Sequence, residues 1–186
     1  SPHSSTIKSI IGIDPNLTNL EIPDWAIDSN CLLKNTFSST NKADIVLAMD
    51  VLEHIQDDHS ALIEWKQALK PDGLLLISVP AFQHLWSRHD IFLGHYKRYN
   101  KNTLNKLAES AGLHTVKIHY AFSFIYPVVL LLRKLLPQIY NRNSDLKKNN
   151  KFINIVLYIL GYIEFKAGGS NYFGTSVVGI FKNDRL

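Results

Sequence analysis

The sequence has 186 residues, of which 46% are hydrophobic and 19% are charged. This length supports one domain with a sizeable core, and this composition excludes a chain that is disordered throughout. The single cysteine, Cys31, excludes an internal disulfide and favours a reducing cytoplasm as the location. Residues 1–10 are polar and lack the pattern of a secretory signal peptide.

The net charge of +4 is concentrated in one stretch of the chain. Residues 133–151 hold six bases and one acid, so this stretch carries +5 and the rest of the chain carries −1. A local basic patch indicates an anionic partner more strongly than an even excess of charge would. Such a run is also typical of a solvated loop, and that alternative stays open.

Short apolar runs bounded by acids or prolines predict buried strands in the first part of the chain. They lie at Ser9–Asp14, Ala43–Met49 and Leu74–Val79, with a weaker run at Cys31–Leu33. A helix is expected before the Leu74–Val79 run. Asp57 or Asp58 would cap its start, where a carboxylate accepts bonds from free N–H groups, and the turn at Pro71–Gly73 would end it.

A polar and aromatic loop over residues 81–100 opens the second part of the chain. Long structured loops that follow a strand are commonly functional. A helix capped by Asn102 or Thr103 is expected after this loop. Strands are then predicted at Thr115–Tyr120 and at Thr175–Phe181.

Two apolar stretches, residues 121–132 and 152–163, flank the basic run. Each is too short to cross a bilayer, which takes about 20 residues. We expect a helical insertion over residues 121–170 within a single domain of residues 1–186, either packed on the domain or lying in a membrane interface. Basic residues beside apolar helices suit an anionic membrane surface, so a peripheral membrane association is expected and a nucleic-acid partner is not.

The alternation of strands and helices predicts an α/β fold, with a Rossmann-like, mostly parallel sheet and flanking helices. Ligands of such sheets bind beyond the carboxyl ends of the strands. Asp14, Asp50 and the 81–100 loop all fall at that edge. The site is therefore expected there.

Four segments carry a family resemblance. They are Ile11–Pro15 (IGIDP), Ala43–Ile55 (ADIVLAMDVLEHI), Leu69–Val79 (LKPDGLLLISV) and the loop from His89 to Tyr99 (HDIFLGHYKRY). Together they resemble the class I S-adenosylmethionine-dependent methyltransferases, of the type 11 and type 12 small-molecule kind, and the Leu-Glu-His turn is the most specific match. The last segment resembles a subgroup often found with glycan or lipid pathways, in which this loop lies over the acceptor pocket.

The resemblance implies S-adenosylmethionine as the cofactor. It places Asp14 and Pro15 at the ribose, because a carboxylate can accept hydrogen bonds from the ribose hydroxyls. It places Met49 and Asp50 at the methionine part. The resemblance counts Glu53 among the cofactor-binding residues. It also implies that Glu53 and His54 of the Leu-Glu-His turn face the acceptor. The acceptor is expected to be a small molecule, a glycan or a lipid-linked compound.

A hydroxyl acceptor would need a general base. His54, His89 and His95 are the candidates, with His54 favoured because its turn lies nearest the expected methyl group. Asp90, Arg98 and Tyr99 are candidate substrate-binding residues, since a guanidinium can grip a phosphate or carboxylate and Asp90 could orient a base. The alternative that these side chains only hold the loop together stays open.

A metal is not predicted. His84, His89 and His95 lack a recognised zinc spacing, and no cysteine pair supports them. A site assembled only in three dimensions stays open.

One departure from the family pattern affects the expected function. The family's first strand and its Gly-x-Gly-x-Gly turn should precede Asp14 by about 20–30 residues. Only 13 residues precede Asp14 here, with Gly12 the single glycine among them. We therefore expect the printed sequence to be truncated or to close its sheet in another way, and to bind the cofactor weakly or not at all. The alternative function is a non-catalytic, degenerate methyltransferase-like domain that acts as a binding module.

Overall fold

The computed structural model describes residues 9–13, 31–34, 42–135 and 151–184. The chain divides into two compact units, Ser1–Asn41 and Lys42–Leu186. In the first unit, β1 (Ile10–Ile13) pairs in parallel with β2 (Cys31–Lys34), so both strands predicted there are confirmed. The predicted burial of β1 was wrong, because its isoleucines are exposed in this two-stranded unit. The predicted cofactor residues Asp14 and Pro15 lie outside the described residues.

The second unit is built on a four-stranded sheet in the order β3-β4-β6-β5. Its strands are β3 (Ala43–Met49), β4 (Leu69–Pro80), β5 (His114–Ala121) and β6 (Ser176–Lys182). β3 and β4 are parallel, whereas β6 runs antiparallel to both of its neighbours. The predicted Rossmann-like α/β fold is confirmed, and its larger sheet is mixed.

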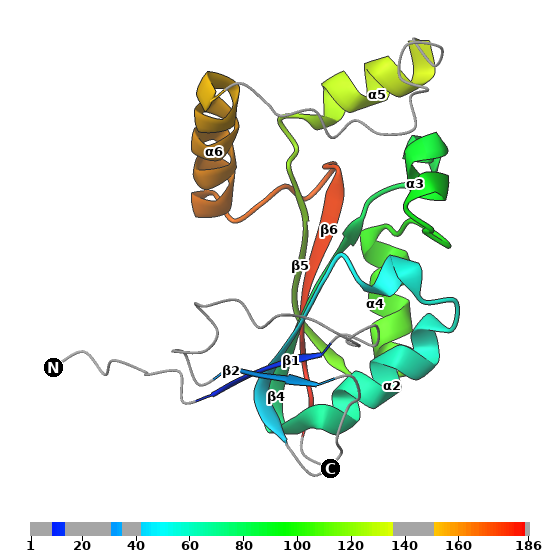
Figure 1. Cartoon of the computed structure of the whole chain (residues 1–186), viewed down its shortest axis with the longest axis vertical. Helices are drawn as coiled ribbons and strands as arrows, with labels where there is room; N and C mark the ends of the chain where they lie inside the picture. The colour runs from blue at the N-terminus through cyan, green and yellow to red at the C-terminus, as the bar shows by residue number, and fades with distance from the viewer. Residues whose placement is uncertain (1–8, 14–30, 35–41, 136–150, 185–186) are drawn as a thin grey trace, which may run out of the picture. The chain divides into compact units, whose positions relative to one another are not determined.

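Two helices, α2 (Asp58–Ala68) and α4 (Lys101–Ser110), lie side by side on one face of this sheet (Figure 1). Leu62 of α2 and Leu104 of α4 are fully buried in the same core as Phe181 of β6. The core therefore lies between this helix pair and the sheet.

The starts of the two helices follow local capping chemistry. The Asp57 carboxylate accepts a hydrogen bond from the Ser60 N–H at 3.1 Å, which is one of the two predicted caps of α2. The Asn100 side chain accepts from the Thr103 N–H at 2.9 Å, and the Thr103 hydroxyl accepts from the Asn100 N–H at 2.9 Å. This reciprocal capping box starts α4 earlier than predicted, so the prediction of Asn102 or Thr103 as the cap was wrong.

The turn at Pro71–Gly73 lies inside β4. Ala43 of β3 pairs with Leu69, and Ile45 of β3 pairs with Leu74, so the intervening residues of β4 bulge out of the ladder. α2 has already ended before this turn. The prediction that the turn ends the helix was therefore wrong, because the bulge lets the strand begin directly after the helix.

One face of the edge strand β3 is apolar and exposed. Ile45, Leu47 and Met49 alternate along β3 and are 54%, 63% and 48% exposed. Within the part of the chain that the structure describes, β3 is an edge strand of the four-stranded sheet. Exposed edge strands with large apolar side chains readily accept a further strand.

Two further helices lie between β5 and β6 in the chain, where the sequence predicts a helical pair. They are α5 (Tyr126–Leu135) and α6 (Lys151–Lys166), and both lie toward the end of the sheet where β3 and β4 finish (Figure 1). Among the described helices, none combines the length and the hydropathy that a membrane span requires. The assignment of residues 1–186 to one domain stays a prediction.

Candidate functional site

The carboxyl end of β3 is fixed to β4 through Asp50. This residue has a left-handed φ of 53°, a conformation that aspartate tolerates better than most residues. Its N–H donates to the Ser78 carbonyl at 2.9 Å, and its carboxylate accepts from the Ser78 hydroxyl at 2.8 Å. The side chains of Met49 and Asp50 remain exposed at the edge where a ligand is expected.

A single 3₁₀ turn, η1 (Leu52–His54), follows directly. Leu52 is fully buried and anchors the turn, Glu53 is 1% exposed, and His54 is exposed. Among the residues that the structure describes, the Glu53 Oε2 atom has no hydrogen-bond partner. Burial raises the pKa of Glu53 to about 7, and the negative charge of Asp50 adds to the rise.

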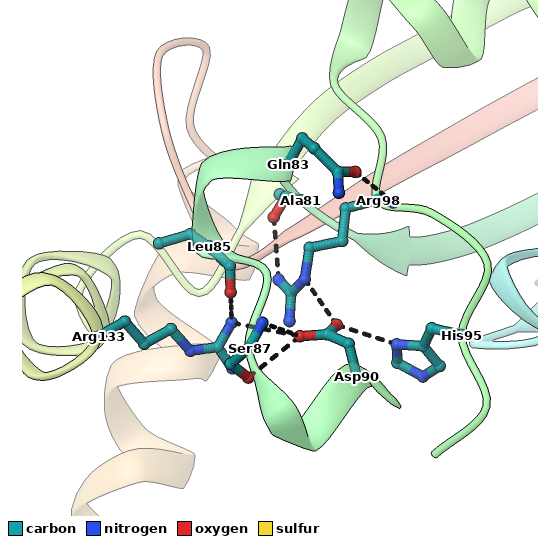
Figure 2. A network of polar contacts seen from close by, with 8 residues as sticks. All are labelled: Ala81, Gln83, Leu85, Ser87, Asp90, His95, Arg98 and Arg133. Carbon is teal, nitrogen blue, oxygen red and sulfur yellow. Dashed lines mark hydrogen bonds and ion pairs between the residues drawn. The ribbon is translucent and has the colours of Figure 1, made fainter. Parts of the chain in front are cut away.

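The loop between β4 and α4 folds around the buried carboxylate of Asp90, which is 0% exposed (Figure 2). The loop contains the turn η2 (Gln83–Leu85) and the short helix α3 (Arg88–Phe92). Asp90 accepts from the Ser87 N–H at 2.8 Å and from the Arg98 Nε at 2.7 Å. Burial by itself would raise the pKa of Asp90, but the hydrogen bond and charge of Arg98 outweigh it and hold that pKa below its usual value.

Two arginines connect this network to the rest of the unit. Arg98 donates from Nη1 to the Ala81 carbonyl at 3.0 Å, at the end of β4. Arg133 of α5 donates to the Leu85 carbonyl, and its Nη1 lies 3.8 Å from the Asp90 Oδ2. Helix α5 is therefore fastened to the loop through charge-assisted contacts (Figure 2).

The network orients His95. Its Nδ1 lies 3.0 Å from the Asp90 Oδ1, and an ionised carboxylate requires the proton to be on Nδ1, which leaves the lone pair on Nε2. Burial lowers the pKa of His95, although Asp90 opposes the shift, so the ring is neutral near pH 7. The His54 ring stands edge-on to it at a centroid distance of 4.7 Å.

Glu53, His54 and His95 form one cluster. A ligand atom from each lies within 4.8 Å of the others. The Tyr96 N–H donates to the Glu53 carbonyl at 2.8 Å, which holds the loop against the turn. The fold thus joins two predicted bases, and one predicted cofactor residue, that are distant in the sequence.

The remaining predicted residues make contacts with protein groups. The Tyr99 hydroxyl donates to the Asp58 carboxylate at 2.9 Å, and burial raises the pKa of Tyr99, with the Asp58 charge adding to the rise. The His89 Nδ1 is buried and has no partner among the described residues. Substrate binding by Asp90, Arg98 and Tyr99, and a catalytic role for His89, stay predictions.

Two residues that position the site were not found from the sequence. Ser78 could have been found, because it lies at the carboxyl end of a predicted strand. Arg133 could not, because only the packing of α5 brings it to Asp90. A hollow of about 560 Å³, lined in part by Lys42 and Lys66, lies at the amino ends of β3 and β4. Glu53, His54 and His95 do not line it.

Comparison with known proteins shows the family. Residues 4–118 match the family model of the methyltransferase domain, which is more than half of the chain. The protein therefore belongs to the methyltransferase domain family, and it is of the class I type whose cofactor is S-adenosylmethionine.

A ubiquinone biosynthesis O-methyltransferase of Rhodopseudomonas palustris is 33% identical over 84 residues. The match covers 41% of this chain and 33% of the relative, so the chain spans about a third of the length of the curated relatives it matches.

Solved structures share the fold. A Bacillus halodurans C-125 protein assigned to the methyltransferases superimposes with a TM-score of 0.58 at 18% identity, over 96% of this chain and 84% of that one. An S-adenosylmethionine-dependent methyltransferase of Archaeoglobus fulgidus does so with a TM-score of 0.51 at 16% identity, over 92% and 75%. At these identities the likeness concerns the fold alone.

Proposed function

We propose that the protein transfers a methyl group from S-adenosylmethionine to a hydroxyl oxygen of a small-molecule acceptor. The observation that carries this proposal is the cluster of Glu53, His54 and His95 just beyond the exposed end of β3. A neutral imidazole next to a strand end, as His95 provides, is suited to accepting the proton of a hydroxyl. The name of the R. palustris relative, an O-methyltransferase, supports an oxygen acceptor.

The residues at the end of β3 fit the cofactor chemically. Met49 and Asp50 are exposed there, and a carboxylate can accept hydrogen bonds from the ammonium of the cofactor's methionine part. When bound, S-adenosylmethionine supplies a methyl group on a positively charged sulfur. Asp50 would hold the methionine part, while Met49 would cover it on the apolar side. Asp14 and Pro15 are proposed to hold the ribose.

The proposed acceptor approaches the cluster from the exposed side of His54. Methyl transfer needs the nucleophile to be close, aligned and shielded from water. The Nε2 lone pair of His95 and the exposed ring of His54 would meet the hydroxyl, while Asp90 keeps His95 in one orientation. The acceptor is proposed to be a small molecule or a lipid-linked compound.

Substitution of the two imidazoles tests this function. In a transfer assay with radiolabelled S-adenosylmethionine and a panel of hydroxylated acceptors, His95→Gln and His54→Gln should each lower kcat by about 10²–10⁴. His114→Gln is the matched control, because His114 is a surface histidine with an acidic neighbour, Asp184, at 3.0 Å. Equal activity of all three variants would contradict the proposal. Cofactor binding with no transfer to any acceptor would favour the non-catalytic binding module.

The printed chain is further proposed to bind the cofactor weakly. Its sequence contains no Gly-x-Gly-x-Gly turn. Such a turn allows the backbone to approach a ligand closely, because glycine lacks a Cβ atom. Activity assays should therefore include a form in which a strand and a glycine-rich turn precede Asp14, from the gene's own reading frame or grafted from a relative.

An anionic membrane surface is the proposed partner of the helical pair, in a peripheral and cytoplasmic protein. α6 exposes Tyr158 and Phe165, which are 74% and 76% accessible, and Ile163 at 57%. The basic stretch over residues 133–151 lies next to it in the sequence. Aromatic and aliphatic side chains beside bases are typical of interfacial helices, which favours a lipid-linked acceptor.

Vesicle flotation tests this partner. The protein should float with vesicles that contain phosphatidylserine at low salt and should dissociate as salt is raised, because the attraction is screened. A Tyr158→Ser/Phe165→Ser variant should float less, whereas a Tyr172→Ser variant, which changes an exposed aromatic outside α6, should behave like the parent. No flotation of the parent at low salt would remove this proposal.

A further inference from the structure

Glu53, His54 and His95 together offer the donor atoms of a metal site, which is more than a single general base requires. Each residue offers one ligand atom, and these atoms lie within 4.8 Å of one another. Ligands of a zinc-like ion at about 2.1 Å can be at most about 4.2 Å apart, so a small closure is needed. The His54 side chain is exposed, so its rotation can supply that closure.

The Glu53 carboxylate gives the second, independent observation. It is 1% exposed, and within the described part of the chain its Oε2 atom has no partner. A backbone hydrogen bond and the charge of Arg98 act on the Glu53 carboxylate, but burying its second oxygen atom without a hydrogen bond is still costly. A cation at this position would remove that cost, since it would supply both a charge and a ligand bond.

His95 has the outer support that metal-binding histidines usually have. Its Nδ1 donates to the Asp90 carboxylate, which leaves Nε2 as the ligand atom. A carboxylate behind a ligating imidazole fixes the ring and makes it a better ligand. Asp90 is itself held by Arg98 and by Ser87, so the orientation of His95 is built into the loop.

We propose that Glu53, His54 and His95 bind one divalent transition-metal cation of the zinc, cobalt or manganese class. Two imidazoles and one carboxylate suit these ions, whereas magnesium and calcium prefer sets made only of oxygen ligands. Three protein ligands leave an open coordination position, as in catalytic metal sites. The acceptor hydroxyl takes that position, and this part of the inference rests on the proposed function.

The chemistry balances without a further reactant. A hydroxyl bound to a cation has a lowered pKa, so it loses its proton to water at neutral pH. The acceptor oxygen forms a bond to the methyl carbon, and the carbon–sulfur bond breaks with its electron pair on sulfur. The products are the methyl ether, the neutral thioether and a proton. The two imidazoles then hold the cation rather than the proton.

Titration with Co²⁺ tests the site directly, because the visible spectrum of Co²⁺ changes when nitrogen ligands replace water. The full chain, stripped with a chelator, should bind one equivalent. Glu53→Gln and His95→Gln should each weaken binding by at least about tenfold, whereas His114→Gln should not change it. Mg²⁺ is the oxygen-preferring control and should not compete at similar concentrations.

A second measurement covers variants that fail to fold. In the unmodified protein, substoichiometric Mn²⁺ should broaden the ring resonances of His54 and His95 before those of His59 and His114. Absence of Co²⁺ binding, binding that is equal in all variants, or broadening of all histidines together would each overturn the metal site.

S-adenosylhomocysteine and Co²⁺ titrated into the form that carries the glycine-rich turn separate this inference from the proposed function, because weak cofactor binding is already expected of the chain without that turn. Cofactor binding without Co²⁺ binding removes the metal site and leaves methyl transfer standing. Co²⁺ binding at the cluster without cofactor binding or transfer supports the metal site and removes the proposed function.

Discussion

Asp90 is the residue on which the geometry of the loop depends. It is fully buried, it pairs with Arg98 at 2.7 Å, and Arg133 lies at 3.8 Å from it. A buried ion pair adds little over apolar packing, but the loss of one partner leaves an uncompensated buried charge. The carboxylate therefore stabilises the loop mainly by satisfying the two arginines and His95.

Asp90→Asn should lower the free energy of unfolding by about 3 kcal/mol, because two buried guanidinium groups lose their counter-charge. Urea denaturation of the variant and the parent would measure the difference. Asp184→Asn is the matched control, since Asp184 pairs with His114 on the surface, where ion pairs contribute at most about 1 kcal/mol. Equal losses for the two variants would contradict the role assigned to Asp90.

His119 should make stability depend on pH. Burial lowers its pKa in the folded protein, and the charge of Lys117 lowers it further. Below the ordinary value of 6.5 the unfolded chain takes up a proton that the folded chain resists. Stability contributed by the neutral ring is therefore present above pH 6.5 and is lost as the pH falls toward the folded-state pKa.

Urea midpoints measured between about pH 7.5 and pH 5 should fall more steeply for the parent than for His119→Gln, which keeps a polar side chain of similar reach. An identical slope for the two proteins would contradict the assignment.

At the scale of the elements, β6 depends on Gly179. A Cβ atom at this position would overlap the ring of Phe181, which is fully buried and cannot move away. Gly179→Ala should therefore lower the free energy of unfolding by about 1–3 kcal/mol. Gly161→Ala in α6 is the control, because nothing lies within 4 Å of its Cβ position and alanine favours the helix by up to about 1 kcal/mol. An equal change in the free energy of unfolding for Gly179→Ala and Gly161→Ala would contradict the close packing of β6 at Phe181.

Three strands were predictable because each is an apolar run closed by an acid or a proline, at Asp14, Asp50 and Pro80. Ala43–Met49 was predicted with the observed bounds, since Asp50 follows it. The start of α4 was not predictable in this way, because Asn100, Asn102 and Thr103 are all residue types that cap helices. Only the pair of hydrogen bonds between Asn100 and Thr103 identifies Asn100 as the cap. The antiparallel direction of β6 is set by the chain's return through α6, which local composition does not encode.

The site was predictable residue by residue but not as a cluster. The Leu-Glu-His turn singled out Glu53 and His54, and the loop pattern singled out His95. Their proximity depends on the Tyr96 N–H bond to Glu53 and on the Asp90 network, both of which join segments distant in the sequence. Spacing along the chain could therefore not predict a three-ligand cluster.

At the scale of the whole molecule, the exposed edge at β3 is the feature that most needs a partner. The resemblance to class I methyltransferases implies a strand before Asp14, and β3 is an edge strand among the described residues, where a further strand could pair. Ile45, Leu47 and Met49 leave one face of β3 apolar and exposed. A form that carries the additional strand and glycine-rich turn should unfold at a higher temperature than the printed chain and should bind less of an apolar dye. Equal melting temperatures and equal dye binding would contradict this expectation.

The proposed function depends on the binding of S-adenosylmethionine at the end of β3. Calorimetric titration with S-adenosylhomocysteine, on the printed chain and on the form with the glycine-rich turn, tests it most directly. We predict one site in the longer form and weaker or absent binding in the 186-residue chain. We also predict that Asp50→Ala weakens binding about tenfold through loss of a charge-assisted hydrogen bond. No binding by the longer form, or binding that Asp50→Ala leaves unchanged, would contradict it.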